Sequence, residues 1–197
     1  MIGLLLVLLL SSPDRVLRSV EIPPSKNTTG YVWSGMSFTD LSRDTIHVTL
    51  DVGETLETQM VRLHPSRTNA NDTFRVDLQY ETSLSVEDEG PHIDLLEWKH
   101  FLSEPIPMQR HSSQQFKVPL LTVAQRQRFP AVTRHEIVDE VHRLHGKYWA
   151  DRVRKVKGPN DYPCSVNVSR YWITVSVRTD GQWRTITVIE FKNMMGC

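Results

Sequence analysis

The sequence feature that most restricts the fold is a pair of β-prone runs on either side of Asp180-Gly181. Residues 170–177 and residues 183–191 are both rich in β-branched and aromatic side chains. An Asp-Gly pair between two such runs is typical of a two-residue turn that joins antiparallel strands. The sequence therefore predicts a β-hairpin in the last part of the chain.

A two-residue turn fixes which residues of the two strands face each other. Counting outward from the turn, Val175 faces Ile186, and Cys164 faces Cys197 at a non-hydrogen-bonded position. Cα atoms at such positions lie about 4.5 Å apart, which suits a disulfide. We therefore expect Cys164 and Cys197, the two cysteines of the chain, to form a disulfide across the hairpin. Two free thiols, or an intermolecular bond from Cys197, are the alternatives.

Composition indicates one globular domain with no global electrostatic field. The chain has 197 residues, of which 39% are hydrophobic and 23% are charged, and this length suits a single domain. Lys plus Arg and Asp plus Glu number 23 each, so the formal net charge is zero. Because no global field attracts nucleic acid, we expect no nucleic-acid partner, and any anion binding must be local.

The amino terminus has the features of a secretory signal peptide. Residues 1–10 are apolar; the run is too short to span a bilayer, which takes about 20 residues, but is typical of a signal-peptide core. We expect a signal peptide over residues 1–19, with the cleavage site open. The alternative is a buried amino-terminal strand or helix. No second long apolar segment follows, so we expect no membrane span and a secreted, extracellular protein.

Three glycosylation sequons agree with that location, at Asn27, Asn71 and Asn167. Asn27 and Asn71 lie in polar, loop-like stretches, and we expect both to be glycosylated. Asn167 has the strand parity of Tyr171 and Ile173, so a glycan there requires the core face of the sheet to end before it.

The remaining domain boundaries follow from turn residues and from alternation. Residues 20–43 contain Pro23-Pro24 and are expected to form an extended approach segment without regular structure, followed by one globular domain over residues 44–197. Alternating apolar residues indicate strands over residues 45–52 and 74–86. Weaker strand signals lie near residues 56–63 and 116–121, and residues 93–102 suit a short helix slightly better than a strand.

One amphipathic helix is predicted from Thr133 to about residue 156. Thr133 and Glu136 have capping-box spacing, in which each side chain satisfies a backbone donor of the first turn. Gly146 should cost this helix about 1 kcal/mol relative to Ala. The expected apolar stripe consists of Ile137, Val141, Leu144 and Tyr148, and it is widened by Val138 and Trp149. The predicted fold is therefore α+β: a predominantly antiparallel sheet, in one or two layers, with one long amphipathic helix and a disulfide-linked hairpin.

Motifs for catalysis, metal binding or cofactor binding do not stand out. His135, His142 and His145 lack the His-Glu-x-x-His spacing of zinc hydrolases, and the sequence has no Gly-x-Ser-x-Gly elbow. We therefore assign no catalytic residue, metal ligand or cofactor. The enzyme that stays open as an alternative is a small secreted hydrolase using His142 or His145 with a carboxylate.

The densest local charge consists of Arg152, Arg154, Lys155 and Lys157. Its spacing resembles linear heparin-binding patterns, and anionic polymers bind dense cations even on a neutral protein. The competing interpretation is a solvated helix end whose cations are favoured by the helix dipole. Weak glycosaminoglycan binding is therefore one hypothesis for this segment.

The second face of the hairpin is unusually apolar for a solvent face. It carries Trp172, Trp183, Ile189 and Phe191. Such a face is either core beneath a second sheet or an exposed surface that stacks on sugars or binds a partner. The leading functional hypothesis is a secreted glycoprotein that acts by binding an extracellular protein or glycan, as a ligand, a co-receptor or a matrix-associated module.

Overall fold

The computed structural model describes residues 16–26, 32–41, 45–51, 54–66, 73–88 and 91–194. These residues form mostly antiparallel β-sheet with few helices, which confirms the predicted predominance of antiparallel sheet. The long helix α2 spans Arg134–Val153, and the short helix α1 spans Val123–Arg126.

Two sheets account for nearly all of the strands. The five-stranded sheet has the order β11-β12-β6-β1-β4 and consists of Gln109–Ser112, Gln115–Lys117, Met60–Pro65, Leu17–Ile22 and Met36–Phe38. The seven-stranded sheet has the order β10-β7-β13-β14-β5 and consists of Ile106–Pro107, Thr73–Glu87, Cys164–Thr179, Gln182–Asn193 and Thr45–Leu50. Two short strands, β8 (His92–Asp94) and β9 (His100–Leu102), also pair with β7, and β2 (Ser25–Lys26) pairs with β3 (Val32–Trp33).

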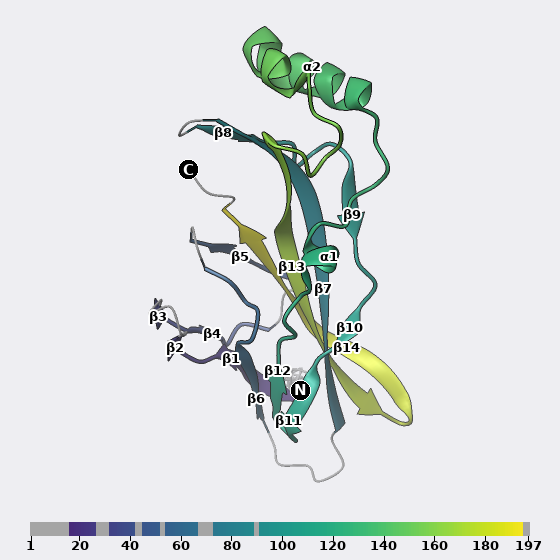
Figure 1. The fold of residues 1–197 in the computed structure, drawn as a ribbon. Helices are drawn as coiled ribbons and strands as arrows, with labels where there is room; N and C mark the ends of the chain where they lie inside the picture. The colour runs from purple at the N-terminus through teal and green to yellow at the C-terminus, as the bar shows by residue number, and fades with distance from the viewer. Residues whose placement is uncertain are drawn as a thin grey trace, which may run out of the picture.

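The two large sheets stack as layers and enclose the main core (Figure 1). Leu17 and Leu63 of the smaller sheet belong to one buried cluster with Val76, Ile173 and Phe191 of the larger one. Removing this apolar surface from water is the main favourable term in folding. Helix α1 lies against the middle of the larger sheet, where the Tyr80 hydroxyl donates to the carbonyl of Gln125 at 3.3 Å.

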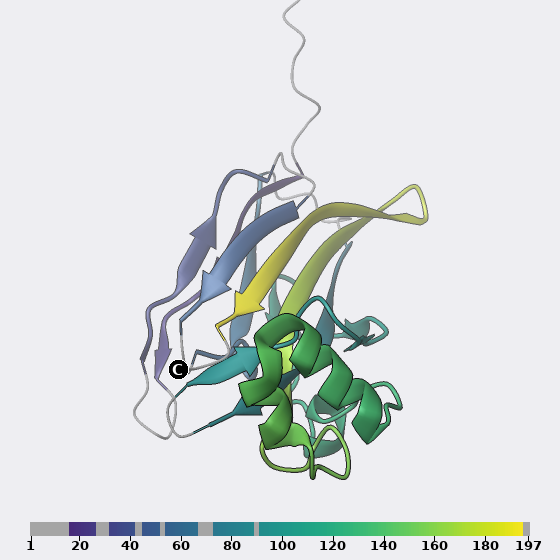
Figure 2. The same ribbon diagram turned by 90° about the horizontal axis from the view of Figure 1, so that it is seen from above.

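Helix α2 covers the end of the larger sheet that the smaller sheet leaves open (Figures 1 and 2). Its buried residues are Ile137, Val141, Ala150 and Val153. They pack in a second cluster with Leu84 and Val86 of β7 and with Cys164 and Val166 of β13. The long strands β7 and β13 therefore carry two cores on one face.

The capping box of α2 is confirmed, but its predicted apolar stripe is wrong at Leu144 and Tyr148. Thr133 accepts from the backbone of Glu136, and Glu136 accepts from the backbone of Thr133. Gly146 has φ 80° and ψ −176°, which kinks the helix. Because the kink changes which side chains face the sheet, Tyr148 is exposed; Leu144, which precedes the kink, is exposed as well.

The predicted register of the hairpin is wrong away from the turn. Asp180 and Gly181 both have positive φ, as expected for the two-residue turn. Beyond Ser176 and Thr185 the register shifts, so that Val175 faces Thr187 and Ile186 is an extra residue on β14. Such a bulge reverses the faces of all residues that follow it. Ile189 and Phe191 consequently join Tyr171 and Ile173 in the main core, whereas Trp172 is half-buried and Trp183 is exposed.

The same shift removes the basis for the Cys164–Cys197 disulfide. Pairing between β13 and β14 reaches only Arg170 and Lys192, and Cys164 lies opposite Val86 of β7. Cys164 is a free, buried thiol. Cys197 lies outside the described residues. The predicted disulfide is therefore not supported.

Two further expectations are corrected. Residues 20–43 are not an approach segment without regular structure, since they contain half of β1 and all of β2, β3 and β4. Leu17, which lies inside the expected signal peptide, is a buried residue of β1, so cleavage after Ser19 would remove part of the core.

Residues 93–102 form parts of two short strands around a turn, because each strand gains backbone hydrogen bonds from β7.

Candidate functional site

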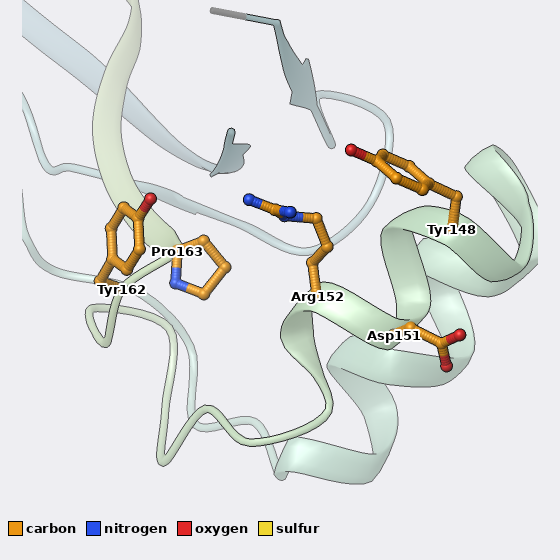
Figure 3. Close-up of a pocket in the computed structure, with 5 residues that line it drawn as sticks. All are labelled: Tyr148, Asp151, Arg152, Tyr162 and Pro163. Carbon is orange, nitrogen blue, oxygen red and sulfur yellow. The ribbon is translucent and has the colours of Figure 1, made fainter. Parts of the chain in front are cut away.

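A hollow with strong recognition chemistry lies between α2 and the segment that leads into β13. It has a volume of about 460 Å³ and is lined by Tyr148, Asp151, Arg152, Tyr162 and Pro163. We call it the tyrosine hollow (Figure 3). Tyr148 and Tyr162 are 62% and 71% exposed, respectively. Each ring therefore presents a large, rigid amphipathic surface to solvent.

Arg152 lies between the two tyrosines. Figure 3 shows its guanidinium extending toward the space between the rings of Tyr148 and Tyr162, while the carboxylate of Asp151 points away. The guanidinium lies 6.0 Å from the centroid of the Tyr148 ring, at the limit of a cation–π contact. It also pairs with the carboxylate of Asp88, and the Tyr148 hydroxyl donates to that carboxylate at 2.6 Å. These contacts hold Arg152 and Tyr148 in one orientation.

The kink at Gly146 places Tyr148 in this hollow. In a straight helix Tyr148 would continue the stripe of Ile137 and Val141 and face the core. After the kink, Trp149 packs against the second core instead, and its ring meets that of Tyr148 edge-on at 5.7 Å. The sequence stripe thus assigned Tyr148 to the core, and no local pattern indicated the change of face.

The other wall is the short loop before β13. Tyr162 and Pro163 are joined by a cis peptide bond. The backbone of Glu87 donates to the carbonyl of Pro163 at 2.9 Å, and the backbone of Cys164 donates to the carbonyl of Asp161 at 2.9 Å. The first bond joins the loop to β7 and the second closes the loop onto the start of β13, so Tyr162 is exposed on an anchored backbone. Tyr162 was not singled out from the sequence, where one Tyr-Pro pair carries no distinctive signal.

The predicted glycosaminoglycan-binding residues do not form one cluster. Arg152 lines the tyrosine hollow, whereas Arg154 lines a different one, of about 570 Å³, beside Thr133 and His135. Arg154 pairs with Asp151 at 2.5 Å. Lys155 and Lys157 are exposed beyond the end of α2. The four cations are thus close together in the sequence but lie in different surroundings.

The helix histidines lie on the solvent side of α2. His135 is 3.2 Å from Asp139, one turn along the same exposed face, and His142 and His145 are exposed. Within the described ranges, no group of three or more His, Cys, Asp or Glu side chains could hold a metal ion. The hydrolase alternative, in which His142 or His145 acts with a carboxylate, does not depend on a metal and stays a prediction.

Of the three sequons, Asn27 and Asn71 lie outside the described residues, and Asn167 is exposed on β13. A bulge lies between Val168 and Arg170, so that Ser169 is extra relative to β7. This bulge reverses the parity expected from Tyr171 and turns Asn167 away from the core. Its side-chain nitrogen donates to Ser165 at 2.8 Å and to Ser85 at 3.1 Å. The parity objection to a glycan at Asn167 is therefore wrong.

No protein-family model matches this chain, and neither does any curated protein or solved structure. Among the described residues, no helix is long and apolar enough to cross a membrane. Any functional conclusion must therefore come from the chemistry of the sites themselves.

Proposed function

We propose that this protein is a secreted glycoprotein that acts by binding an extracellular protein through the tyrosine hollow. One observation carries the proposal: Tyr148 and Tyr162, two exposed rings, flank Arg152 in one concave surface. Tyr and Arg are enriched among the few residues that contribute most of the energy of protein interfaces. The apolar leader and the three sequons support the extracellular setting.

Preorganisation of the hollow supports the same conclusion. Ordering flexible side chains at an interface costs about 0.5 to 1.5 kcal/mol for each side chain. Arg152 is already held by Asp88, and Tyr148 is held by the same carboxylate. Less rotamer entropy is therefore lost on binding than for free surface side chains.

A cell-surface binding assay with the full-length, tagged protein tests this function. We expect the double variant Tyr148→Ser/Tyr162→Ser to lose binding by at least about tenfold, because each ring is a potential anchor. The matched control is Leu102→Ser/Trp183→Ser, which removes two exposed apolar side chains elsewhere. Equal binding by the tyrosine variant and the control would rule out the hollow as the interface.

A second candidate is weak glycosaminoglycan binding by Arg152, Arg154, Lys155 and Lys157. One observation favours it: Lys155 and Lys157 are exposed, and neither has a carboxylate at ion-pair distance in the part of the chain that the structure describes. Retention on heparin should fall steeply with salt, since the Debye length is about 8 Å at physiological ionic strength.

Neutralising all four cations to Gln should abolish that retention. The matched control is Arg178→Gln/Arg184→Gln, which removes two exposed arginines at the hairpin tip. Retention that survives the fourfold change, or that disappears equally in the control, would end this second candidate.

A further inference from the structure

A second, smaller hollow lies beside the β2–β3 pair, on segments that the tyrosine hollow does not use. Its volume is about 170 Å³, and its walls include Ser25, Trp33, Thr58, Gln59 and Arg126. We call it the Glu57 hollow after a buried carboxylate among its lining residues. A cavity of about 150 Å³ is enough for benzene. The Glu57 hollow is therefore the size of one six-membered ring.

Both carboxylate oxygens of Glu57 accept hydrogen bonds from neighbouring groups. Its side chain is only 2% exposed and pairs with Arg126 at 2.6 Å. The hydroxyl of Tyr171 and the backbone of Leu121 each donate to it at 2.9 Å. Burial, followed by the charge of Glu57, raises the pKa of Tyr171 above its usual value of 10.0, which keeps that hydroxyl a donor. Because the charges of Glu57 and Arg126 cancel, the hollow favours a neutral ligand over an ion.

Thr58 holds an unfavourable backbone conformation at this hollow. Its φ is 68°, a region that β-branched residues rarely occupy. The backbone of Thr58 donates to Val118 at 3.1 Å, and the backbone of Val118 donates to Gln59 at 2.9 Å. Strained residues that are over-determined by their surroundings in this way cluster at ligand sites.

Trp33 contributes a buried donor that lacks a protein acceptor. Its side chain is 2% exposed, and its indole Nε1 has no hydrogen-bond partner among the described residues. Buried N–H groups are nearly always paired, because an unpaired one loses its hydration without compensation. The side-chain carbonyl of Gln59 already accepts from Ser25 at 2.5 Å, which leaves its amide nitrogen as a further donor.

We propose that the Glu57 hollow binds one neutral sugar ring. A pyranose has the required size, and its hydroxyls accept from Trp33, Gln59 and Arg126 without adding charge. Leu120 is 66% exposed at the rim and supplies an apolar contact for the C–H groups of the ring. Sites of this kind combine apolar walls with a few placed polar groups. The inference is independent of the protein interface proposed for the tyrosine hollow.

The test is an NMR titration of the tryptophan indole N–H resonances of the full chain. The probes are the methyl glycosides of mannose, galactose and N-acetylglucosamine, with glucuronate as the charged arm. We expect the Trp33 resonance to shift saturably with at least one neutral glycoside and not with glucuronate. The absence of a shift with every glycoside, or saturation by glucuronate alone, would overturn the proposal.

Two variants locate the binding. Trp33→Phe keeps the aromatic ring but removes the donor and the indole resonance, so its affinity is measured by calorimetric titration; we expect it to fall about tenfold, as for the loss of one buried hydrogen bond. Trp172→Phe, the same change on the half-buried outer face, should leave affinity unchanged. Leu120→Ser, at an exposed position that the fold does not need, should weaken binding several-fold. Unchanged affinity in both Trp33→Phe and Leu120→Ser would exclude this hollow as the sugar site.

Discussion

At the scale of single residues, Cys164 is a buried thiol whose chemistry is suppressed. Burial, and then the charge of Asp161, raise its pKa to about 12. Only the thiolate reacts with alkylating agents. We therefore expect Cys164 to resist iodoacetamide at pH 8 in the native protein and to react once the chain is unfolded in urea.

Peptide mapping after alkylation measures this directly. Val166, two residues along the same strand and in the same cluster, offers a matched reporter, since Val166→Cys should be protected to a similar degree. Rapid labelling of Cys164 in the folded protein would contradict its position beneath α2.

For alanine substitution at Gly146, the structure predicts the opposite change in stability to the one that helix propensity predicts. Propensity alone predicts that Gly146→Ala stabilises α2 by about 1 kcal/mol. A new Cβ would meet nothing within 4 Å, but φ is +80° with ψ near 180°, and this region is essentially confined to glycine. We therefore expect Gly146→Ala to destabilise the protein by about 1 to 3 kcal/mol in urea unfolding.

Gly158→Ala is the matched control, because its Cβ also meets nothing and its φ is not in the left-handed region. That change should be neutral or stabilising by about 0.4 to 1 kcal/mol. Stabilisation by Gly146→Ala would mean that α2 runs straight through this position.

At the scale of elements, the start of α2 should respond to acid. The Lys99 side chain, and then the backbone and hydroxyl of Thr133, lower the pKa of Glu136 from 4.5 to about 2. The ionised form therefore stabilises the fold above pH 4.5, and this contribution is lost as the pH falls toward about 2. Urea unfolding of Glu136→Gln should show a deficit relative to wild type at pH 6 that shrinks toward pH 2.

Glu104→Gln, at an exposed glutamate, provides the comparison for a general change of charge. It should show a smaller deficit at pH 6. A Glu136→Gln deficit that stays constant over this pH range would show that the carboxylate charge does not contribute.

The features that depend on residues close together in the sequence could be predicted from it. The capping box of Thr133 and Glu136 and the turn at Asp180 involve neighbours in the chain, so the start of α2 and the hairpin tip were predictable. Ser169 is extra relative to β7, a strand distant in sequence, and Ile186 is extra relative to β13, its partner in the hairpin. Because each bulge reverses the faces beyond it, the positions of Asn167 and Phe191, and the cysteine pairing, could not follow from parity alone.

The candidate sites were less predictable than the fold. Arg152 was singled out for its charge, yet its setting depends on a kink in α2 and on contact with Asp88. The Glu57 hollow joins residues from distant parts of the chain, such as Ser25 and Arg126. Sequence periodicity indicates which residues of one helix or strand are buried. It does not indicate which residues from distant segments come together in a site.

At the scale of the whole molecule, we expect the core between the sheets and the core beneath α2 to unfold locally and independently of each other. Ile137 lies in the cluster beneath α2, and Ile173 lies between the sheets. Ile→Val at either fully buried position should cost about 0.5 to 1.5 kcal/mol. Hydrogen exchange should show Ile137→Val accelerating mainly the amides of α2, whereas Ile173→Val accelerates those of both sheets, because local openings follow cooperative units. The same exchange pattern in both variants would indicate a single cooperative core.

The projecting hairpin tip has a consequence for how copies of this protein meet at high concentration. β5 pairs with β14 only from Val188 to Asn193, so residues 182–187 form an edge to which no other described strand adds, and the tip extends away from the body (Figure 2). Such edges are templates for aggregation unless charge or twist blocks them. Arg184 is exposed on this edge and would face a like charge in many pairings of two copies. We expect Arg184→Thr to form larger species in sedimentation velocity, with Arg178→Thr on the inner strand as the comparison. We therefore expect the charge of Arg184 to hinder the pairing of this edge with a second copy.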